Sequence, residues 1–409
     1  MASASNIAAW SNALKQYYRK DAVQDLVYKS HPLFEMVPKD NRFKGKSSPI
    51  PIYYGRPQGR SATFATAQSN ATASKIGEFL MTRKKNYGVV TVDGETMLAA
   101  EGDEYAFLNA ITTEIDGALK SVGDSLSRNL FRQSSGSMGK IAATTTVGST
   151  SIDLADPNDV LNFEVGMKLV GSTADGGGTV KSGTVEVVGV DRSKYNTGDT
   201  DQLTLSGNYT AGIATGAVAD FLFIEGDYDN GISGLADWVP AAAPGSTAFY
   251  GQDRSVDPTR LGGNRFDGSS LTIEEALIEG SGLSAREGGE PDCAFVSFSD
   301  FIALEKGLTS QVQRNVVETE RFSYRALELY APHGIVKIIP DKDCPKGIAY
   351  LLQMDTWSLM SIGETVRILE HDGQKMLRQS SDDGVEVRVG FYGNLACTAP
   401  GFNTRVTLP

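Results

Sequence analysis

One long amphipathic helix is the sequence feature that most constrains the fold of this chain of 409 residues. Between residues 101 and 132, apolar side chains recur at steps of three and four, the spacing that places them on one helical face. These apolar residues are Phe107, Ile111, Ile115, Ala118, Val122, Leu126 and Leu130. Such a helix would be roughly 48 Å long at ~1.5 Å per residue, whereas an average helix has only ~11–12 residues. We therefore expect residues 101–140 to contain a spine helix.

The ends and the glycines of this helix indicate how it is stabilised. Asp103 and Glu104 stand near its start, and Arg128 and Arg132 stand near its end, which suits the helix dipole. Three glycines inside the helix each lower its intrinsic stability by about 1 kcal/mol relative to alanine. The helix therefore needs other elements packed along its length.

Composition excludes several classes of function. The net charge of −12 argues against nucleic-acid packaging or a polybasic membrane-surface role, because phosphate contacts need an excess of Lys and Arg. The three cysteines, Cys293, Cys344 and Cys397, are far apart and form no C-x-x-C pair, so we expect a reducing compartment without disulfide or zinc framework. We find no apolar run of ~18 residues and no signal peptide pattern.

The first 44 residues predict an N-terminal arm. Ser5 or Asn6 can cap one short amphipathic helix, and residues 21–28 form a second apolar piece. The pair His31-Pro32 and then Pro38 are expected to break the chain. Two such small pieces cannot bury themselves, so they must lie on their own body or on a neighbouring molecule.

Residues 45–100 predict an extended hairpin loop. Ile50, Ile52 and Tyr54 recur at every second position, and a second alternating run follows at residues 87–92, which we interpret as the two arms. Residues 55–75 between the arms are rich in Gly, Ala, Ser and Thr, and such a tip has little to pack against.

Charge separates this hairpin from a later part of the chain. Residues 41–92 contain nine basic residues against the single acid Glu78, whereas residues 267–305 contain nine acids against the single base Arg286. Each set can simply be a solvated face, but together they could steer one subunit's hairpin onto its neighbour, although exposed ion pairs contribute only ~0–1 kcal/mol each. The candidate intersubunit contacts are Arg56, Arg60, Lys75, Arg83, Lys84, Lys85, Glu274, Glu275 and Glu279.

The remaining chain predicts an all-β insertion domain inside an α+β body. Residues 141–225 carry short Thr/Val-rich runs between glycine turns, as in a small barrel or sandwich. Residues 226–268 would connect to a body at 269–365 that has a helix capped by Ser269 or Ser270 and strands at 293–298, 334–339 and 347–352. Residues 366–409 would return to the strands beside the spine, with a strand pair at 385–392 and 395–397, and residues 310–330 form a polar stretch that looks variable.

No catalytic or cofactor site emerges from the sequence. His31, His333 and His371 each stand in a turn, where a lone histidine is usually solvated. Residues 176–182 lack the glycine before Lys181 that a phosphate loop needs, and residues 191–201 do not follow the order of a calcium-binding loop. We expect polar turns at both places, a turn also at 227–230, and a protein that is not an enzyme and needs no cofactor or metal.

The order of arm, basic hairpin, spine helix and α+β body resembles the major capsid proteins of tailed bacteriophages. Local stretches are similar too, at residues 267–272, 339–350 and 390–397. The resemblance implies an α+β fold with an extended loop, a peripheral domain and an axial domain, shared with encapsulin-type shells and the herpesvirus capsid floor. Residues 141–225 depart from the family pattern.

The resemblance also implies a function and partners. Hexamers and pentamers would form an icosahedral shell around double-stranded DNA, with a separate scaffolding protein, a portal and a decoration protein as partners, and without sequence-specific DNA binding or a membrane. The protein would assemble in the bacterial host cytoplasm and reside in the virion. Two alternatives stay open: an encapsulin-like nanocompartment shell, and a tail-associated structural protein whose residues 141–225 bind carbohydrate.

Overall fold

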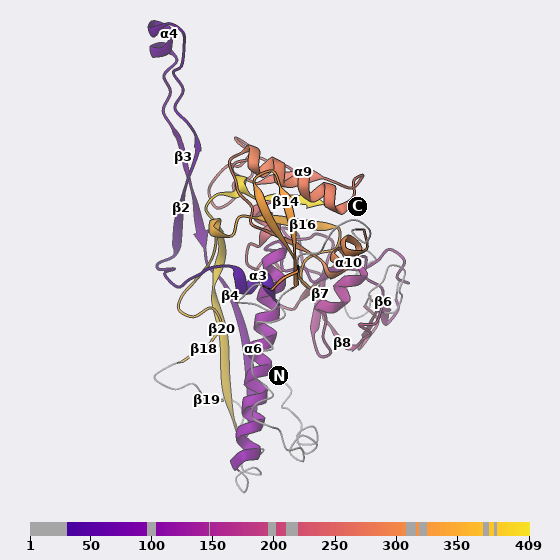
Figure 1. Cartoon of the computed structure of the whole chain (residues 1–409). Coiled ribbons are helices and arrows are strands. Elements are labelled where there is room, and N and C mark those ends of the chain that lie inside the picture. Colours follow the sequence, from indigo (N-terminus) through magenta and orange to yellow (C-terminus); the bar gives the residue numbers. More distant parts are fainter. Residues whose placement is uncertain are drawn as a thin grey trace.

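A hairpin projects from one end of the molecule, and a long helix runs along the body beneath it (Figure 1). The computed structural model describes residues 31–95, 104–146, 148–194, 202–209, 220–307, 316–318, 325–370, 376–379 and 383–409. Within these residues, the strands form two sheets of six strands, one sheet of seven strands and the two-stranded hairpin.

The spine helix α6 spans Glu104–Phe131 and confirms the predicted helix over the described part of its range. Its C-terminal half is buried in the main hydrophobic core through Val122, Leu126 and Leu130. Strand β4 lies close against it, since a Cβ added at Gly88 would be 2.9 Å from a methyl group of Val122. The apolar stripe read from the sequence is therefore the face that packs on the sheet.

Gly234 lies directly beneath the end of this helix. A Cβ at this position would be 2.2 Å from the carbonyl oxygen of Asn129 and 2.4 Å from that of Arg132, so only glycine fits. We expect Gly234→Ala to lower the free energy of unfolding by about 1–3 kcal/mol, measured by chemical denaturation. Gly282→Ala is the control: nothing lies within 4 Å of its added Cβ, and it should be neutral or stabilising. Equal effects of the two changes would contradict this packing.

The sheet beside α6 is organised around one long strand. Strand β20 pairs with β17, β18, β19 and β4, and β1 extends the sheet from β17. The strands are β1 (Lys39–Asp40), β4 (Lys84–Asp93), β17 (Trp357–Ser361), β18 (Arg367–Ile368), β19 (Met376–Arg378) and β20 (Gly384–Cys397). The predicted strand pair at 385–397 is thus wrong, because β20 is continuous. Buried Asn394 allows this, since its side chain is bonded to Ser233, Thr82 and Tyr250.

The projecting hairpin pairs β2 (Ser47–Gly55) with β3 (Lys75–Thr82), and the short helix α4 (Phe64–Ser69) lies at its tip. The predicted second arm at 87–92 is wrong, because those residues belong to β4 and pair with β20. The reason is a nearer apolar alternation: Phe79 and Met81 are buried with Ile50 and Ile52 of the opposite strand.

A mixed sheet of seven strands forms the second large unit, in the order β11-β21-β16-β12-β15-β14-β13. Its elements are β11 (Asn264–Asp267), β12 (Cys293–Val296), β13 (Val316–Glu318), β14 (Arg325–Ala331), β15 (Gly334–Pro340), β16 (Ile348–Leu352), β21 (Thr404–Thr407) and the helices α9 (Ile273–Arg286) and α10 (Phe298–Gly307). Strands β12, β15 and β16 confirm predicted strands.

Two expectations for this unit are wrong. Helix α9 is capped by Thr272, whose capping box with Glu275 outcompetes the predicted caps Ser269 and Ser270. The last strand β21 pairs with β11 and β16 of the seven-stranded sheet. Residues 366–409 therefore do not all belong to the sheet beside the spine helix. The polar stretch 310–330 includes strand β13 and part of β14, whose Leu327 and Leu329 pack on the core of the sheet.

The small β-unit has its own core. Six antiparallel strands follow the order β5-β10-β7-β8-β9-β6, and a bridge between Ile141 and Leu154 joins the two ends into a barrel. The elements are β5 (Gly139–Lys140), β6 (Ser151–Ile152), η2 (Pro157–Asn162), β7 (Lys168–Ser172), β8 (Val185–Val190), β9 (Leu203–Leu205) and β10 (Phe221–Ile224). Buried Phe163, Leu169 and Val187 belong to a cluster separate from the main core.

The described end of the arm is packed rather than broken. Pro32 begins the short helix α3 (Pro32–Met36), because proline is tolerated in the first helical turn. Leu33 and Phe34 are buried in the main core. The predicted caps Ser5 and Asn6 lie outside the described residues. Three further short elements are α8 (Leu235–Trp238), η3 (Met354–Thr356) and η4 (Pro400–Phe402).

Candidate subunit interface

The hairpin changes from buried to exposed along its length. At its root, Ile50 and Phe79 are buried in the body. Further out, the exposed fractions are 54% for Tyr53, 68% for Ile76 and 82% for Phe64 at the tip. A lone two-stranded ribbon is marginally stable in water, and clustered exposed apolar side chains mark interaction sites. The outer half of the hairpin is therefore a surface that fits a partner.

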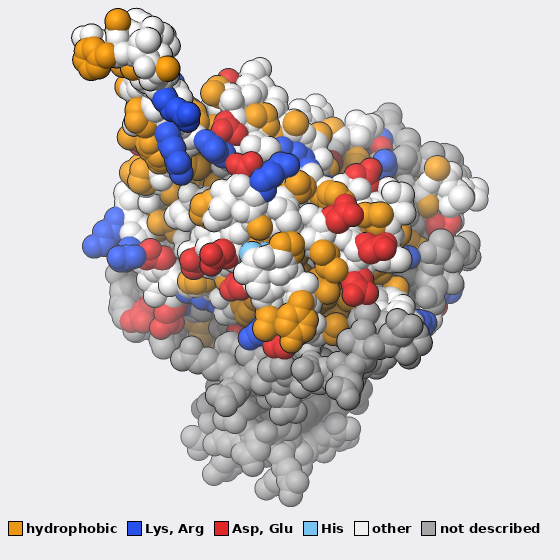
Figure 2. Space-filling view, turned by 45° about the horizontal axis from the view of Figure 1, so that its top comes forward, with side chains coloured by type: hydrophobic (Ala, Val, Ile, Leu, Met, Phe, Trp, Pro, Cys, Tyr) orange, Lys and Arg blue, Asp and Glu red, His pale blue; other side chains and the backbone are white. Residues whose placement is uncertain are grey.

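Basic side chains share this outer half. Arg56, Arg60 and Lys75 are exposed on it, and Figure 2 shows blue basic groups beside orange apolar groups along the projection. Lys85 is exposed on β4 of the body. The structure thus brings three of the six predicted basic contacts onto the projecting element.

Two predicted contacts act inside their own chain instead. The Arg83 guanidinium lies 5.7 Å from the ring centre of Phe43. The Lys84 ammonium donates a 2.6 Å hydrogen bond to the carbonyl oxygen of Asp229, and burial lowers the pKa of Lys84. Both side chains thus make contacts within their own chain, and their predicted intersubunit contact stays a prediction.

The predicted acidic contacts lie on helix α9. Glu279 is exposed and Glu274 is half-buried, whereas Glu275 accepts hydrogen bonds from the backbone and hydroxyl of Thr272, which hold its pKa below the usual value. Among the described residues, no ion pair joins these acids to the basic groups of the hairpin. Any pairing between the two sets would therefore need a second molecule.

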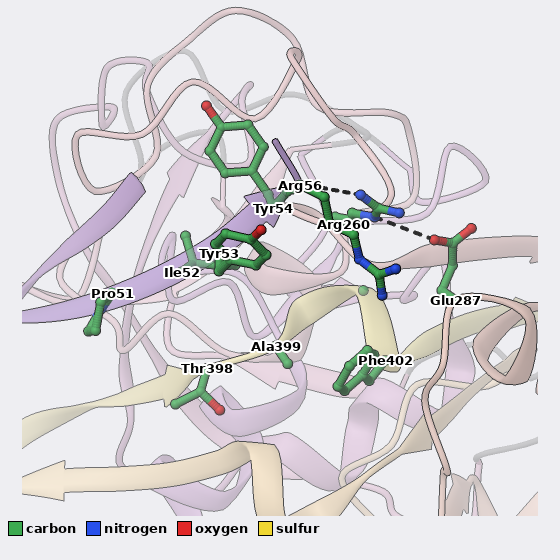
Figure 3. A pocket seen from close by; sticks show the side chains of 11 residues that line it. Pro51, Ile52, Tyr53, Tyr54, Arg56, Arg260, Glu287, Thr398, Ala399 and Phe402 are labelled. Carbon is green, nitrogen blue, oxygen red and sulfur yellow. Dashed lines mark hydrogen bonds and ion pairs between the residues drawn. The ribbon is translucent and has the colours of Figure 1, made fainter. Parts of the chain in front are cut away.

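A crevice separates the hairpin from the body at its root. A cavity of about 260 Å³ is lined by Tyr53, Tyr54 and Arg56 of the hairpin side, and by Arg260 and Phe402 of the body. Figure 3 shows Arg260 between the backbone of Tyr54 and the carboxylate of Glu287. Sequence analysis did not find this site, because the segments around residues 54, 260, 287 and 402 are far apart in the chain.

Solved structures identify the architecture. A chain in the capsid asymmetric unit of cyanophage A-1(L) matches with TM-score 0.55 at 11% identity, covering 98% of this chain and 99% of that chain. This chain has the fold of a tailed-phage major capsid protein. Chains of a native GTA particle capsid and of Microbacterium phage Oxtober96 match at TM-scores 0.47 and 0.43, with 9% and 12% identity. The alignments include 99% of this chain in both cases, together with 98% of the GTA chain and 100% of the Oxtober96 chain.

Sequence comparison adds nothing to that likeness: no protein-family profile and no curated protein matches this chain. The likeness to capsid proteins therefore rests on the order of the elements and on the fold, and not on sequence identity. None of the helices in the described residues has the length and apolarity that crossing a membrane requires.

In this capsid fold, the predicted polar turns are held by internal bonds. The backbone N–H of Gly177 donates to the carboxylate of Asp229, and Lys181 forms an ion pair with Asp220, so a carboxylate occupies the loop where a phosphate would bind. Asp191 accepts hydrogen bonds from Ser193, and residues 195–201 of that segment lie outside the described part. No group of three potential metal-ligating side chains occurs within the described residues.

His31 departs most from the sequence prediction of a solvated turn residue. It is 1% exposed, and its ring nitrogens lie 2.6 Å from Asp124 and 2.7 Å from Asp343. Both nitrogens face carboxylates, which only accept hydrogen bonds when ionised. Only the protonated ring carries an N–H donor on each nitrogen and can therefore donate to both. Burial alone would lower the pKa of His31, but the hydrogen bonds to Asp124 and Asp343 outweigh it and raise the pKa to about 9. The other two predicted turn histidines give no comparable site: His333 bonds the carbonyl oxygen of Pro291, and His371 lies outside the described residues.

Proposed function

We propose that this chain is a major capsid protein that assembles with copies of itself into the shell of a tailed bacteriophage. The observation that supports this most is a fold likeness that covers 98% of the chain, with a projecting hairpin that its own body does not cover. In this proposal the subunits form hexamers and pentamers of an icosahedral shell around double-stranded DNA. A scaffolding protein, a portal and a decoration protein would be the partners, and the virion would be the location.

The physical basis is a contact between different surfaces of identical subunits. The outer hairpin of one subunit lies on the body of the next, and such head-to-tail contacts close into rings. Burial of Tyr53, Phe64 and Ile76 against the neighbouring subunit would favour association by ~25 cal/mol for each Å² of apolar surface removed from water. The domain names follow the same proposal: the unit around β20 and α6 is peripheral, and the unit of seven strands is axial.

The acidity of the chain has a role in this proposal. A net charge of −12 would keep the inner wall from adhering to packaged DNA, because like charges repel. DNA is therefore enclosed without sequence-specific binding. Lumen-facing residues that prove predominantly basic in an assembled shell would contradict this part.

Expression of the full chain, alone and together with a scaffolding protein, tests the proposal. Light scattering and electron microscopy should detect closed shells that contain DNA when produced during infection. Closed shells that contain only protein cargo would instead favour a nanocompartment. Monomers or dimers under every condition would overturn the assembly function and leave a tail-associated binding protein as the better interpretation.

Reversing one charge on the hairpin tests the electrostatic contribution. We expect Lys75→Glu to raise the protein concentration needed for assembly by about two- to fivefold at low salt, and by less at high salt, because an exposed ion pair contributes ~0–1 kcal/mol and is screened. Lys168→Glu, an exposed reversal on the barrel, is the control. Assembly is followed by light scattering against concentration. An equal effect of both changes would remove steering by the hairpin from the proposal.

A further inference from the structure

The two strands of the hairpin shift register at one position. Tyr53 lies opposite Ile76, but Gly55, two residues further along β2, lies opposite Lys75, which is only one residue further along β3. Tyr54 is therefore an extra residue, and β2 has a β-bulge. A bulge bends its strand and leaves a backbone group outside the ladder. Gly55 suits this close approach, since a Cβ there would be 2.8 Å from the Cβ of Lys75.

The body holds the bulge through one side chain. The Arg260 guanidinium donates a 2.8 Å hydrogen bond from Nη1 to the carbonyl oxygen of Tyr54. Its Nε lies 3.6 Å from Glu287 and 3.8 Å from Asp257, which orient the planar group. The backbone of Arg260 is fixed as well, because its carbonyl oxygen accepts from the N–H of Gly401.

The bulge lies where the hairpin leaves the body. On the inner side, the backbone N–H of Leu80 donates to the carbonyl oxygen of Tyr250, and the apolar residues of the root are buried. On the outer side, Arg56 and the tip residue Phe64 are exposed. Among the described residues, the bond from Arg260 to Tyr54 is the outermost hydrogen bond between hairpin and body.

We propose that Arg260 is a positioning residue that sets the angle at which the hairpin leaves the body. The crevice beside it gives the outer hairpin room to tilt when the Arg260–Tyr54 bond opens. Eight residues, 56–63, lead from the bulge to α4, and at ~3.3 Å per residue they span at most ~26 Å, so a tilt of about 10° moves the tip by about 5 Å. The consequence for assembly rests on the proposed capsid function: a fixed angle favours one shell curvature, and a free angle permits several.

Distance measurements on the unassembled full-length subunit test the angle directly. Spin labels at Thr66→Cys on α4 and Ser270→Cys on the body are both exposed, and the three native cysteines are buried. The parent protein should give one narrow distance distribution. We expect Arg260→Gln to broaden it by about 5 Å, the displacement estimated for a 10° tilt. Arg260→Lys should give an intermediate width, because an ammonium group cannot bridge a carbonyl and two carboxylates as a fork does.

The control is Arg286→Gln. Arg286 is an exposed base that lines the same crevice, and its guanidinium lies 4.0 Å from the carboxylate of Glu287 without reaching the hairpin. It should leave the distance distribution unchanged. An unchanged distribution in Arg260→Gln, with a melting temperature equal to the parent, would overturn the positioning role. This readout needs no assembly, so it stands apart from the proposed function. If shells form, Arg260→Gln should yield a mixture of sizes, and uniform shells of parental size would also contradict the inference.

Discussion

A chain in which an asparagine–glycine turn replaces residues 57–73 is expected to fold normally and to form no shells. The removed residues contain no buried side chain, so the free energy of unfolding should change by no more than about 0.5 kcal/mol. The turn suits a two-residue hairpin connection between Arg56 and Ser74. Assembly should be lost because the contact of this tip is made with another subunit. Chemical denaturation and light scattering measure the two expectations separately.

Phe64 allows a finer version of the same test. Its side chain is 82% exposed at the tip, and Val256, 63% exposed on the body, provides a matched apolar control. If Phe64 is an anchor of the interface, Phe64→Ala should weaken each contact by about 1–3 kcal/mol and Val256→Ala by much less. A folded tip deletion that assembles as well as the parent would refute the role of the hairpin, and an unfolded one would place the tip in the core.

The second large effect concerns the buried histidine of the arm. His31→Leu leaves the buried carboxylate of Asp343 without its histidine partner. We expect this substitution to lower the free energy of unfolding by about 3–5 kcal/mol at pH 6. Ser127 still donates a 2.6 Å bond to Asp343, so part of the network persists. Denaturant unfolding of parent and variant gives the difference. His333→Gln, a change in a half-buried ring bonded to one carbonyl oxygen, is the control and should cost far less.

The pH dependence of this difference follows from the direction of the pKa shift. The pKa of His31 is raised from 6.5 to about 9, so the folded state binds its proton more tightly than the unfolded state does. The stabilisation is therefore complete below about pH 6.5 and is lost as pH rises through about 9, a total of about 3 kcal/mol. The charged groups that act on the ring are Asp124 of α6 and Asp341, Lys342 and Asp343 of the turn after β15.

Asp341 also titrates near this range, so the variant is the proper reference. Burial and the neighbouring Asp343 raise the pKa of Asp341 to about 7. Asp341 is present in both proteins, but the charge on His31 lowers its pKa, so the difference between parent and His31→Leu reports the histidine together with its coupling to Asp341. That difference should shrink as pH rises from 6 to 10. A difference that stays constant over this interval would show that His31 is not held as a cation.

The sequence predicted those elements whose information is local. The stripe from Val122 to Leu130 defines α6 because its spacing alone places it on one face. Strands β12, β15 and β16 were also placed correctly, since each is a short run rich in apolar residues, which is typical of a buried strand. The order of elements was enough to indicate the capsid fold, because that order is preserved where individual residues are not.

The sequence failed where distant segments decide the structure. Two alternating runs, 75–82 and 84–93, competed as partners for β2, and only the packing of Phe79 against Trp238 settles the choice. His31 becomes a buried cation only because Asp124 and Asp343 meet it from far along the chain. The same applies to Arg260, whose partner Tyr54 is 206 residues away. No periodicity or local motif encodes such contacts.

An electron cryomicroscopy map of the assembled particle tests the central claim most directly. We predict that the outer hairpin of each subunit lies on the body of an adjacent copy, with Phe64 and Ile76 covered by that neighbour and Arg56 or Lys75 close to its acids. A particle in which the hairpin folds back over its own crevice, or stands free in solvent, would contradict the claim.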